Sequence, residues 1–229
     1  RTPRGVGLSR GRELLARPPR ARDAEAAAVD QGADGMECDV RLTKDNQMLL
    51  WHDADMKRTA GYAGRIAEMT YPQIRQHYPQ AMLLEELLEI ARDNDMELAI
   101  ETKHPVPQGS LVEKKVLELL EQEELETDIV LMSFSWLAIE NIRKINPQQK
   151  TVALLEDKFN YLMQRFTSAP ILGPSVEYLR SNPEMTHAIK PLYVWTVDDA
   201  DDMRFCLENG VEVLITNNPS YARKVLGYH

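Results

Sequence analysis

Short apolar or β-branched runs alternate with helical patterns along most of this chain, and this alternation constrains the fold more than any other feature. The strand-like runs are residues 35–42, 48–51, 97–101, 129–133, 151–155, 192–197 and 212–216, and a weaker run lies near 170–172. Leucine and isoleucine at helical spacing fill the intervals, for example over residues 83–93. Strands that alternate with helices pair in parallel, which predicts an α/β architecture.

Two architectures fit this alternation, an eight-stranded barrel and an open doubly wound sheet. The length of 229 residues suits either a single barrel or one large open-sheet domain. The sequence contains no G-x-G-x-x-G or G-K-[ST] phosphate loop. The absence of these motifs disfavours an open sheet that binds nucleotides.

The first 22 residues differ in composition from the rest of the chain. They contain seven arginines and one glutamate, which gives a net charge of +6, together with three prolines and few aliphatic residues. The segment is either a basic arm for an acidic partner or a poorly packed start, and its composition favours the second interpretation. We therefore assign residues 1–22 to a basic, atypical N-terminal segment and residues 23–229 to one globular domain.

Charge and cysteine content limit the partners and the compartment. The whole chain carries a net charge of −9, which argues against nucleic acid and anionic membranes as partners. Its apolar runs are far too short for a membrane span. Cys38 and Cys206 are too few for a disulfide scaffold or a zinc ribbon, which favours a reducing compartment. With no leader-like pattern at its start, the sequence predicts a cytoplasmic protein.

One junction breaks the alternation, because only residues 43–47 separate two strand-like runs. A parallel crossover needs about a dozen residues or more, so this junction predicts a tight hairpin. Asp45 and Asn46 tolerate the positive φ angles of a two-residue type I′ turn. With these two residues at the centre of the turn, Asp39 is expected to pair with His52.

Paired residues share one face of a sheet, and alternate residues on a strand share it too. Glu37, Asp39 and His52 should therefore converge. Two neighbouring carboxylates repel each other unless a positive group lies between them, and Mg²⁺ or Ca²⁺ prefers such oxygen ligands. Glu101 ends another strand-like run, where barrel enzymes place catalytic groups, and Lys103 follows on the same face.

These five residues fit metal-assisted cleavage of a phosphate ester. The cation and Lys103 would stabilise negative charge, and His52 would move a proton. A simpler interpretation is that the two acids on the first strand cap a hairpin and that His52 is a surface residue. A third interpretation is a lyase that stabilises an enolate, although the later strands offer no lysine base.

Further motifs follow in a fixed order along the chain. They are Gly32-Ala-Asp-Gly35-Met-Glu37-Cys-Asp39-Val-Arg-Leu-Thr-Lys-Asp45, Leu50-Trp-His52-Asp53, Arg58-Thr59, Ile100-Glu101-Thr-Lys103, Ser133-Phe134, Val194-Trp195-Thr-Val197 and Gly210-Val-Glu-Val-Leu-Ile-Thr216. Taken together, this ordered set resembles the glycerophosphodiester phosphodiesterase family over residues 30–226.

The resemblance implies a TIM barrel that hydrolyses small glycerophosphodiesters to sn-glycerol 3-phosphate and an alcohol. It implies that Glu37, Asp39 and Glu101 bind the metal and that His52 is a catalytic acid or base. It also implies that Lys103 faces the phosphate and that Trp195 borders the glycerol pocket. Ser133 ends a strand on the expected active face, and we predict that it lines the substrate pocket.

The start of the chain departs from the family pattern. The family opens with a strand that ends in His-Arg-Gly, followed by Pro-Glu-Asn-Thr, and its histidine is the second catalytic imidazole. Here that segment is missing or scrambled, since no histidine precedes His52. We therefore expect an atypical or disrupted first strand and weak or lost hydrolysis. The alternative is an inactive barrel that binds a phosphodiester or a metal without turnover.

Overall fold

The computed structural model describes residues 13–16, 31–123, 128–157, 160–187 and 190–227, with the backbone alone for 13–16. Its parallel strands are β1 (Glu13–Ala16), β2 (Gly35–Leu42), β4 (Glu97–Thr102), β5 (Ile129–Ser133), β6 (Thr151–Leu155), β7 (Ile171–Pro174), β8 (Tyr193–Val194) and β9 (Val213–Thr216). One further strand, β3 (Met48–Leu50), pairs antiparallel to β2.

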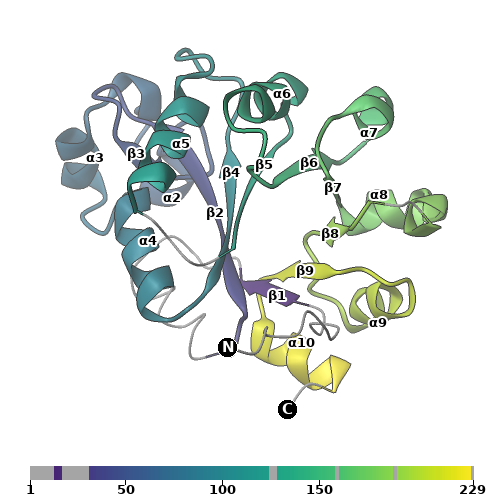
Figure 1. The fold of residues 1–229 in the computed structure, drawn as a ribbon. Helices are drawn as coiled ribbons and strands as arrows, with labels where there is room; N and C mark the ends of the chain where they lie inside the picture. Colours follow the sequence, from purple (N-terminus) through teal and green to yellow (C-terminus); the bar gives the residue numbers. More distant parts are fainter. Residues whose placement is uncertain (1–12, 17–30, 124–127, 158–159, 188–189, 228–229) are drawn as a thin grey trace, which may run out of the picture.

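Helices lie around the outside of the strands (Figure 1). They are α2 (Lys57–Ala60), α3 (Tyr71–His77), α4 (Leu84–Asp93), α5 (Leu111–Glu123), α6 (Trp136–Ile145), α7 (Tyr161–Phe166), α8 (Val176–Ser181), α9 (Ala200–Glu208) and α10 (Pro219–Leu226), with 3₁₀ turns at Ile66–Glu68 and Pro183–His187. No helix among the described residues is both long and apolar enough to cross a bilayer.

The strand order is that of an eight-stranded barrel. The sheet runs β7-β6-β5-β4-β2-β1-β9-β8, and each pair along this path is parallel. The two ends, β7 and β8, meet at two isolated parallel bridges, Leu172 with Leu192 and Ser175 with Trp195. The barrel that the family resemblance implied is therefore confirmed, although no continuous ladder between the described residues of β7 and β8 closes it.

A first strand is present in the basic N-terminal segment. The backbone of β1 pairs with β2 on one side, where Ala16 lies opposite Met36, and with β9 on the other, where Ala16 lies opposite Thr216. The prediction set residues 1–22 apart as a basic, atypical segment, and residues 13–16 of that segment form a strand of the sheet. The arginine-rich composition obscured a short strand with two consecutive leucines. The rest of residues 1–22 lies outside the described residues.

The hairpin between β2 and β3 is one residue longer than predicted. Asn46 donates its backbone N–H to Thr43 O (3.0 Å), and Thr43 donates to Gln47 O (3.0 Å). Among the residues of this loop, only Asn46 has a positive φ, at 59°. This is a type I turn followed by a left-handed residue, a three-residue loop rather than the two-residue type I′ turn. The pairing of Asp39 with His52 is therefore wrong, since Val40 pairs with Leu50 and Trp51 N donates to Asp39 O (2.8 Å).

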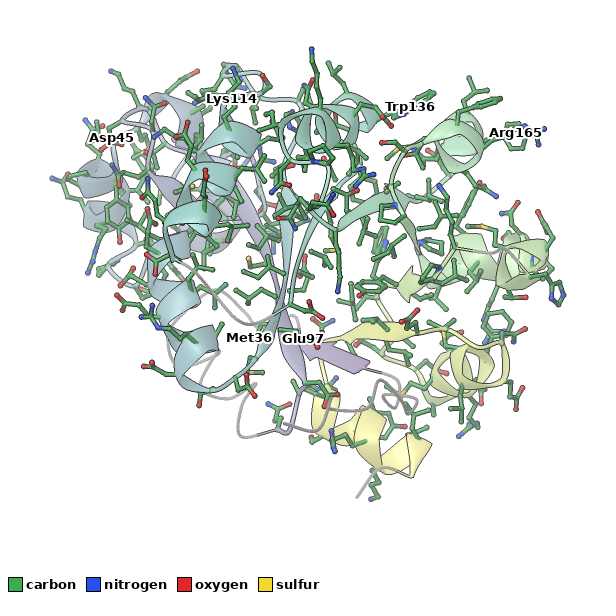
Figure 2. All side chains as sticks on the ribbon, in the orientation of Figure 1. Met36, Asp45, Glu97, Lys114, Trp136 and Arg165 are labelled. Carbon is green, nitrogen blue, oxygen red and sulfur yellow. The ribbon has the colours of Figure 1, made fainter. Side chains whose placement is uncertain are left out.

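Alternate residues on the strands fill the barrel interior. The interior cluster contains Ala99, Val130, Met132, Val152, Leu154, Ile171, Val213 and Ile215, with Phe134, Tyr193 and Trp195 packed against it. Figure 2 labels Met36 and Glu97 near the beginning of β2 and β4, and Asp45, Lys114 and Trp136 beyond the ends of β2, β4 and β5. The side chains described next lie at the carboxyl ends of the strands, where barrel enzymes bind their substrates.

Candidate active site

Three carboxylates meet between the middle of β2 and the carboxyl end of β4. Asp39 on β2 lies directly opposite Glu101 on β4, and Glu37 is two residues earlier on the same face as Asp39. One carboxylate oxygen from each of these residues lies within 4.8 Å of the others. All three side chains are buried, with 5% to 7% of each residue exposed. The structure thus brings together the three predicted metal-ligating residues.

Lys103 partly balances the negative charge of this cluster. Its Nζ lies 2.7 Å from Glu101 Oε1 and 3.1 Å from Asp39 Oδ1, and the residue is itself buried. One ammonium group leaves three buried carboxylates with excess negative charge. A compact set of oxygen donors with this charge suits a hard divalent cation such as Mg²⁺ or Ca²⁺, so the residues present fit the predicted group.

The pKa of Glu101 is raised to about 7, because burial, helped by the charge of Asp39, outweighs the opposing effect of Lys103. Metal binding requires the ionised carboxylate, so protons compete with the cation below this pKa. We expect the apparent affinity for Mg²⁺ to be constant above pH 8 and to fall by up to about tenfold per unit below pH 7. Calorimetric titrations between pH 5.5 and 8.5 measure this, and a pH-independent affinity would contradict it.

His52 reaches the same site although its predicted pairing is wrong. The strand β3 ends at Leu50, so the alternation of strand faces no longer fixes where His52 points. The side chain lines the same cavity as Glu37, Glu101 and Lys103. The hairpin continues to position it, because Arg41 Nε donates a hydrogen bond to His52 O (3.0 Å).

Two neighbours orient the imidazole of His52. Its Nδ1 lies 2.7 Å from Asp53 Oδ1, and Arg58 Nε donates to Asp53 Oδ2 (2.7 Å). An ionised carboxylate only accepts hydrogen bonds, so Asp53 holds the proton on Nδ1. This leaves Nε2 as the nitrogen that can exchange a proton with a bound molecule.

The cavity at this end of the barrel has a volume of about 290 Å³. Its lining residues are Glu37, His52, Glu101, Lys103, Met132, Phe134, Leu154, Glu156, Trp195 and Ile215. Trp195 is held in place by its Nε1, which donates to Gly173 O (2.7 Å), and by an edge-to-face contact with Phe134 at 5.3 Å between ring centroids. The cavity therefore has a charged side on β2 and β4 and a largely apolar side on β5, β6, β8 and β9.

The residues that line the cavity differ from the predicted ones at two positions, Ser133 and Glu156. Ser133 is buried outside the cavity lining, and its Oγ donates to Thr102 O (2.9 Å) and accepts from Ser135 N (3.2 Å). These contacts join β4 to the start of α6, and they give no support to a substrate contact by Ser133. Glu156 lines the cavity but was missed in the sequence. The sequence feature that could have identified Glu156 is its position directly after the strand-like run 151–155. Residues at the carboxyl ends of barrel strands face the active site.

Comparison with known proteins identifies relatives over most of the chain. The model of the glycerophosphoryl diester phosphodiesterase family matches residues 23–221. The probable glycerophosphodiester phosphodiesterase 1 of Mycobacterium tuberculosis is 34% identical, over 89% of this chain and 86% of that protein. The glycerophosphodiester phosphodiesterase of Caldanaerobacter subterraneus is 27% identical, over 84% of this chain and 85% of that protein.

Solved structures show the same fold. An Oleispira antarctica phosphodiesterase, determined in complex with the product sn-glycerol-3-phosphate, superposes with a TM-score of 0.83 at 17% identity and covers 94% of this chain and 96% of its own. A glycerophosphodiester phosphodiesterase from Parabacteroides distasonis gives a TM-score of 0.79 at 22% identity, over 94% of this chain and 96% of its own.

Proposed function

Because this chain belongs to the glycerophosphoryl diester phosphodiesterase family, we propose that it binds glycerophosphodiesters and hydrolyses them to sn-glycerol 3-phosphate and an alcohol. The observation that carries this proposal is the buried cluster of Glu37, Asp39 and Glu101 with its ion-paired Lys103. Glu37, Glu101 and Lys103 line one cavity together with His52. In the reaction, water adds to phosphorus while the bond from phosphorus to the alcohol oxygen breaks.

Each residue has a chemical role in this proposal. Glu37, Asp39 and Glu101 hold a divalent cation, which supplies charge stabilisation and Lewis acidity when it is bound. Lys103 contacts the phosphate oxygens and stabilises the negative charge that develops on them. His52 donates or accepts the proton through Nε2, while Asp53 and Arg58 hold its ring. Trp195 borders the glycerol moiety.

We further propose that turnover is weak. No histidine precedes His52 in this chain, so the second imidazole of the family pattern has no counterpart before it. Loss of one acid–base group lowers a rate by about 10²–10⁴-fold. The same observation favours a second candidate function, a barrel that binds a metal and a phosphodiester without hydrolysing it.

Release of sn-glycerol 3-phosphate from glycerophosphocholine distinguishes the two functions. The full chain is incubated with substrate and either Mg²⁺ or Ca²⁺, and the product is measured enzymatically with and without EDTA. Slow release that EDTA abolishes supports the hydrolase. No release, together with measurable binding of the cation, supports the inactive barrel. Turnover as fast as that of an ordinary enzyme would contradict the proposed weakening.

A further inference from the structure

Glu156 is a carboxylate in the cavity that the cation and the proton transfer do not require. It directly follows β6, and the alternation of this strand gives it the same side as Val152 and Leu154 in the barrel interior. Leu154 and Glu156 both line the cavity. The side chain therefore faces the cavity from the strand two places along the sheet from β4.

A short loop fixes the backbone of Glu156. The backbone N–H groups of Glu156 and Asp157 both donate to Asn160 Oδ1, at 2.9 Å and 3.1 Å. Within the described part of the chain, the Glu156 carboxylate forms no ion pair and no hydrogen bond. Its position is thus set by the backbone, and its two carboxylate oxygens can accept hydrogen bonds from a ligand.

The surroundings of Glu156 indicate what kind of group it receives. The other residues on this side of the cavity are apolar or aromatic, namely Met132, Phe134, Leu154, Trp195 and Ile215. A ligand group there needs carbon atoms that pack on these side chains and hydrogen-bond donors that reach one carboxylate. The glycerol moiety meets both requirements, because its carbon chain carries two neighbouring hydroxyls.

We propose that Glu156 determines specificity by accepting hydrogen bonds from the two free hydroxyls of the glycerol moiety. This inference rests on the proposed function, which places the phosphate at Lys103 and the glycerol beside Trp195. Hydrogen bonds to an ionised carboxylate are stronger than those between neutral groups. Each hydroxyl of the glycerol moiety donates one hydrogen bond, so loss of either hydroxyl weakens binding at Glu156.

Binding of small phosphates to the full chain tests this inference without turnover. Calorimetry with saturating Mg²⁺ compares sn-glycerol 3-phosphate, n-propyl phosphate, which lacks both hydroxyls, and phosphocholine, which carries a cation instead. The wild type should bind sn-glycerol 3-phosphate about tenfold or more tightly than n-propyl phosphate, since hydrogen bonds to charged groups contribute measurably to binding.

Glu156→Met keeps the length of the side chain and removes both acceptors. This variant should bind sn-glycerol 3-phosphate only as tightly as it binds n-propyl phosphate. Its affinity for n-propyl phosphate should stay within about twofold of the wild-type value, because only the hydroxyl contacts are lost. Glu156→Gln, which can still accept and donate, should retain an intermediate preference. Asp157→Ala is the matched control, because it removes a neighbouring acid that does not line the cavity.

Several results would overturn the inference. One is that Glu156→Met still prefers sn-glycerol 3-phosphate over n-propyl phosphate as strongly as the wild type does. Others are that this variant loses affinity equally for all three ligands, or for phosphocholine alone. The last is that the wild type binds none of the three ligands. The last of these also removes the support for phosphate binding at Lys103. Hydrolysis of glycerophosphocholine is measured separately, so a chain that prefers sn-glycerol 3-phosphate through Glu156 but releases no product contradicts only the hydrolase.

Discussion

Asp39→Ala should lower the affinity for Mg²⁺ or Ca²⁺ by at least about 100-fold. Loss of a residue that only hydrogen-bonds to a metal ligand already lowers metal affinity by about 10–100-fold, and Asp39 is itself a proposed ligand. Asp39 supplies one of three oxygen donors that lie within 4.8 Å of one another. With the cation lost, glycerophosphodiester hydrolysis should fall to background. Calorimetric titration measures the affinity, and release of sn-glycerol 3-phosphate measures the hydrolysis.

Two controls separate a lost site from a lost fold. Asp201→Ala removes an acid of the same size from the surface, where Asp201 pairs with Arg204, and should leave metal binding unchanged. Circular dichroism should show an intact Asp39→Ala protein, since Lys103 keeps its 2.7 Å ion pair with Glu101. Unchanged cation affinity in a folded Asp39→Ala protein would mean that the metal binds elsewhere.

His52→Ala should reduce the remaining turnover by about 10²–10⁴-fold and leave cation affinity within about twofold, because His52 moves a proton. Asp53→Asn should have a smaller effect on turnover, since it disturbs the orientation and tautomer of the ring and leaves the ring in place. Steady-state kinetics with glycerophosphocholine measure both variants.

His77→Ala is the matched control for His52→Ala. His77 lies on α3, stacks on Tyr62 and is not among the residues that line the cavity. It should retain full activity. If His52→Ala hydrolysed the substrate as fast as the wild type, the proton would come from another group, and the assignment of His52 would fail.

Alternation along the strands made most of the site predictable. Glu37 and Asp39 lie two positions apart, as do Glu101 and Lys103, so each pair keeps one face whatever the exact bounds of its strand. The register between β2 and β4 then brings Asp39 opposite Glu101. Because sequence spacing within a strand survives small errors in boundaries, this convergence followed from the sequence.

The remaining features depend on contacts that the sequence does not encode locally. The hairpin register depended on whether the loop between the strands begins at Asp45, as predicted, or at Lys44, as observed. This difference of one residue changes every residue pair between β2 and β3. His52 still reaches the cavity because β3 ends before it. Placing Glu156 required knowledge of which face of β6 is interior, and only the packing of Val152 and Leu154 in the barrel interior showed this face.

A crystal of the full chain grown with Mn²⁺ tests the central claim most directly. Anomalous diffraction at the manganese absorption edge locates the ion without any assumption about which residues bind it. The proposal predicts one strong peak at a metal–oxygen distance of about 2.0–2.6 Å from Glu37, Asp39 and Glu101, as hard cations bind carboxylates. A map with no peak at this cluster, or with its main peak elsewhere, would contradict a metal-dependent site in this barrel.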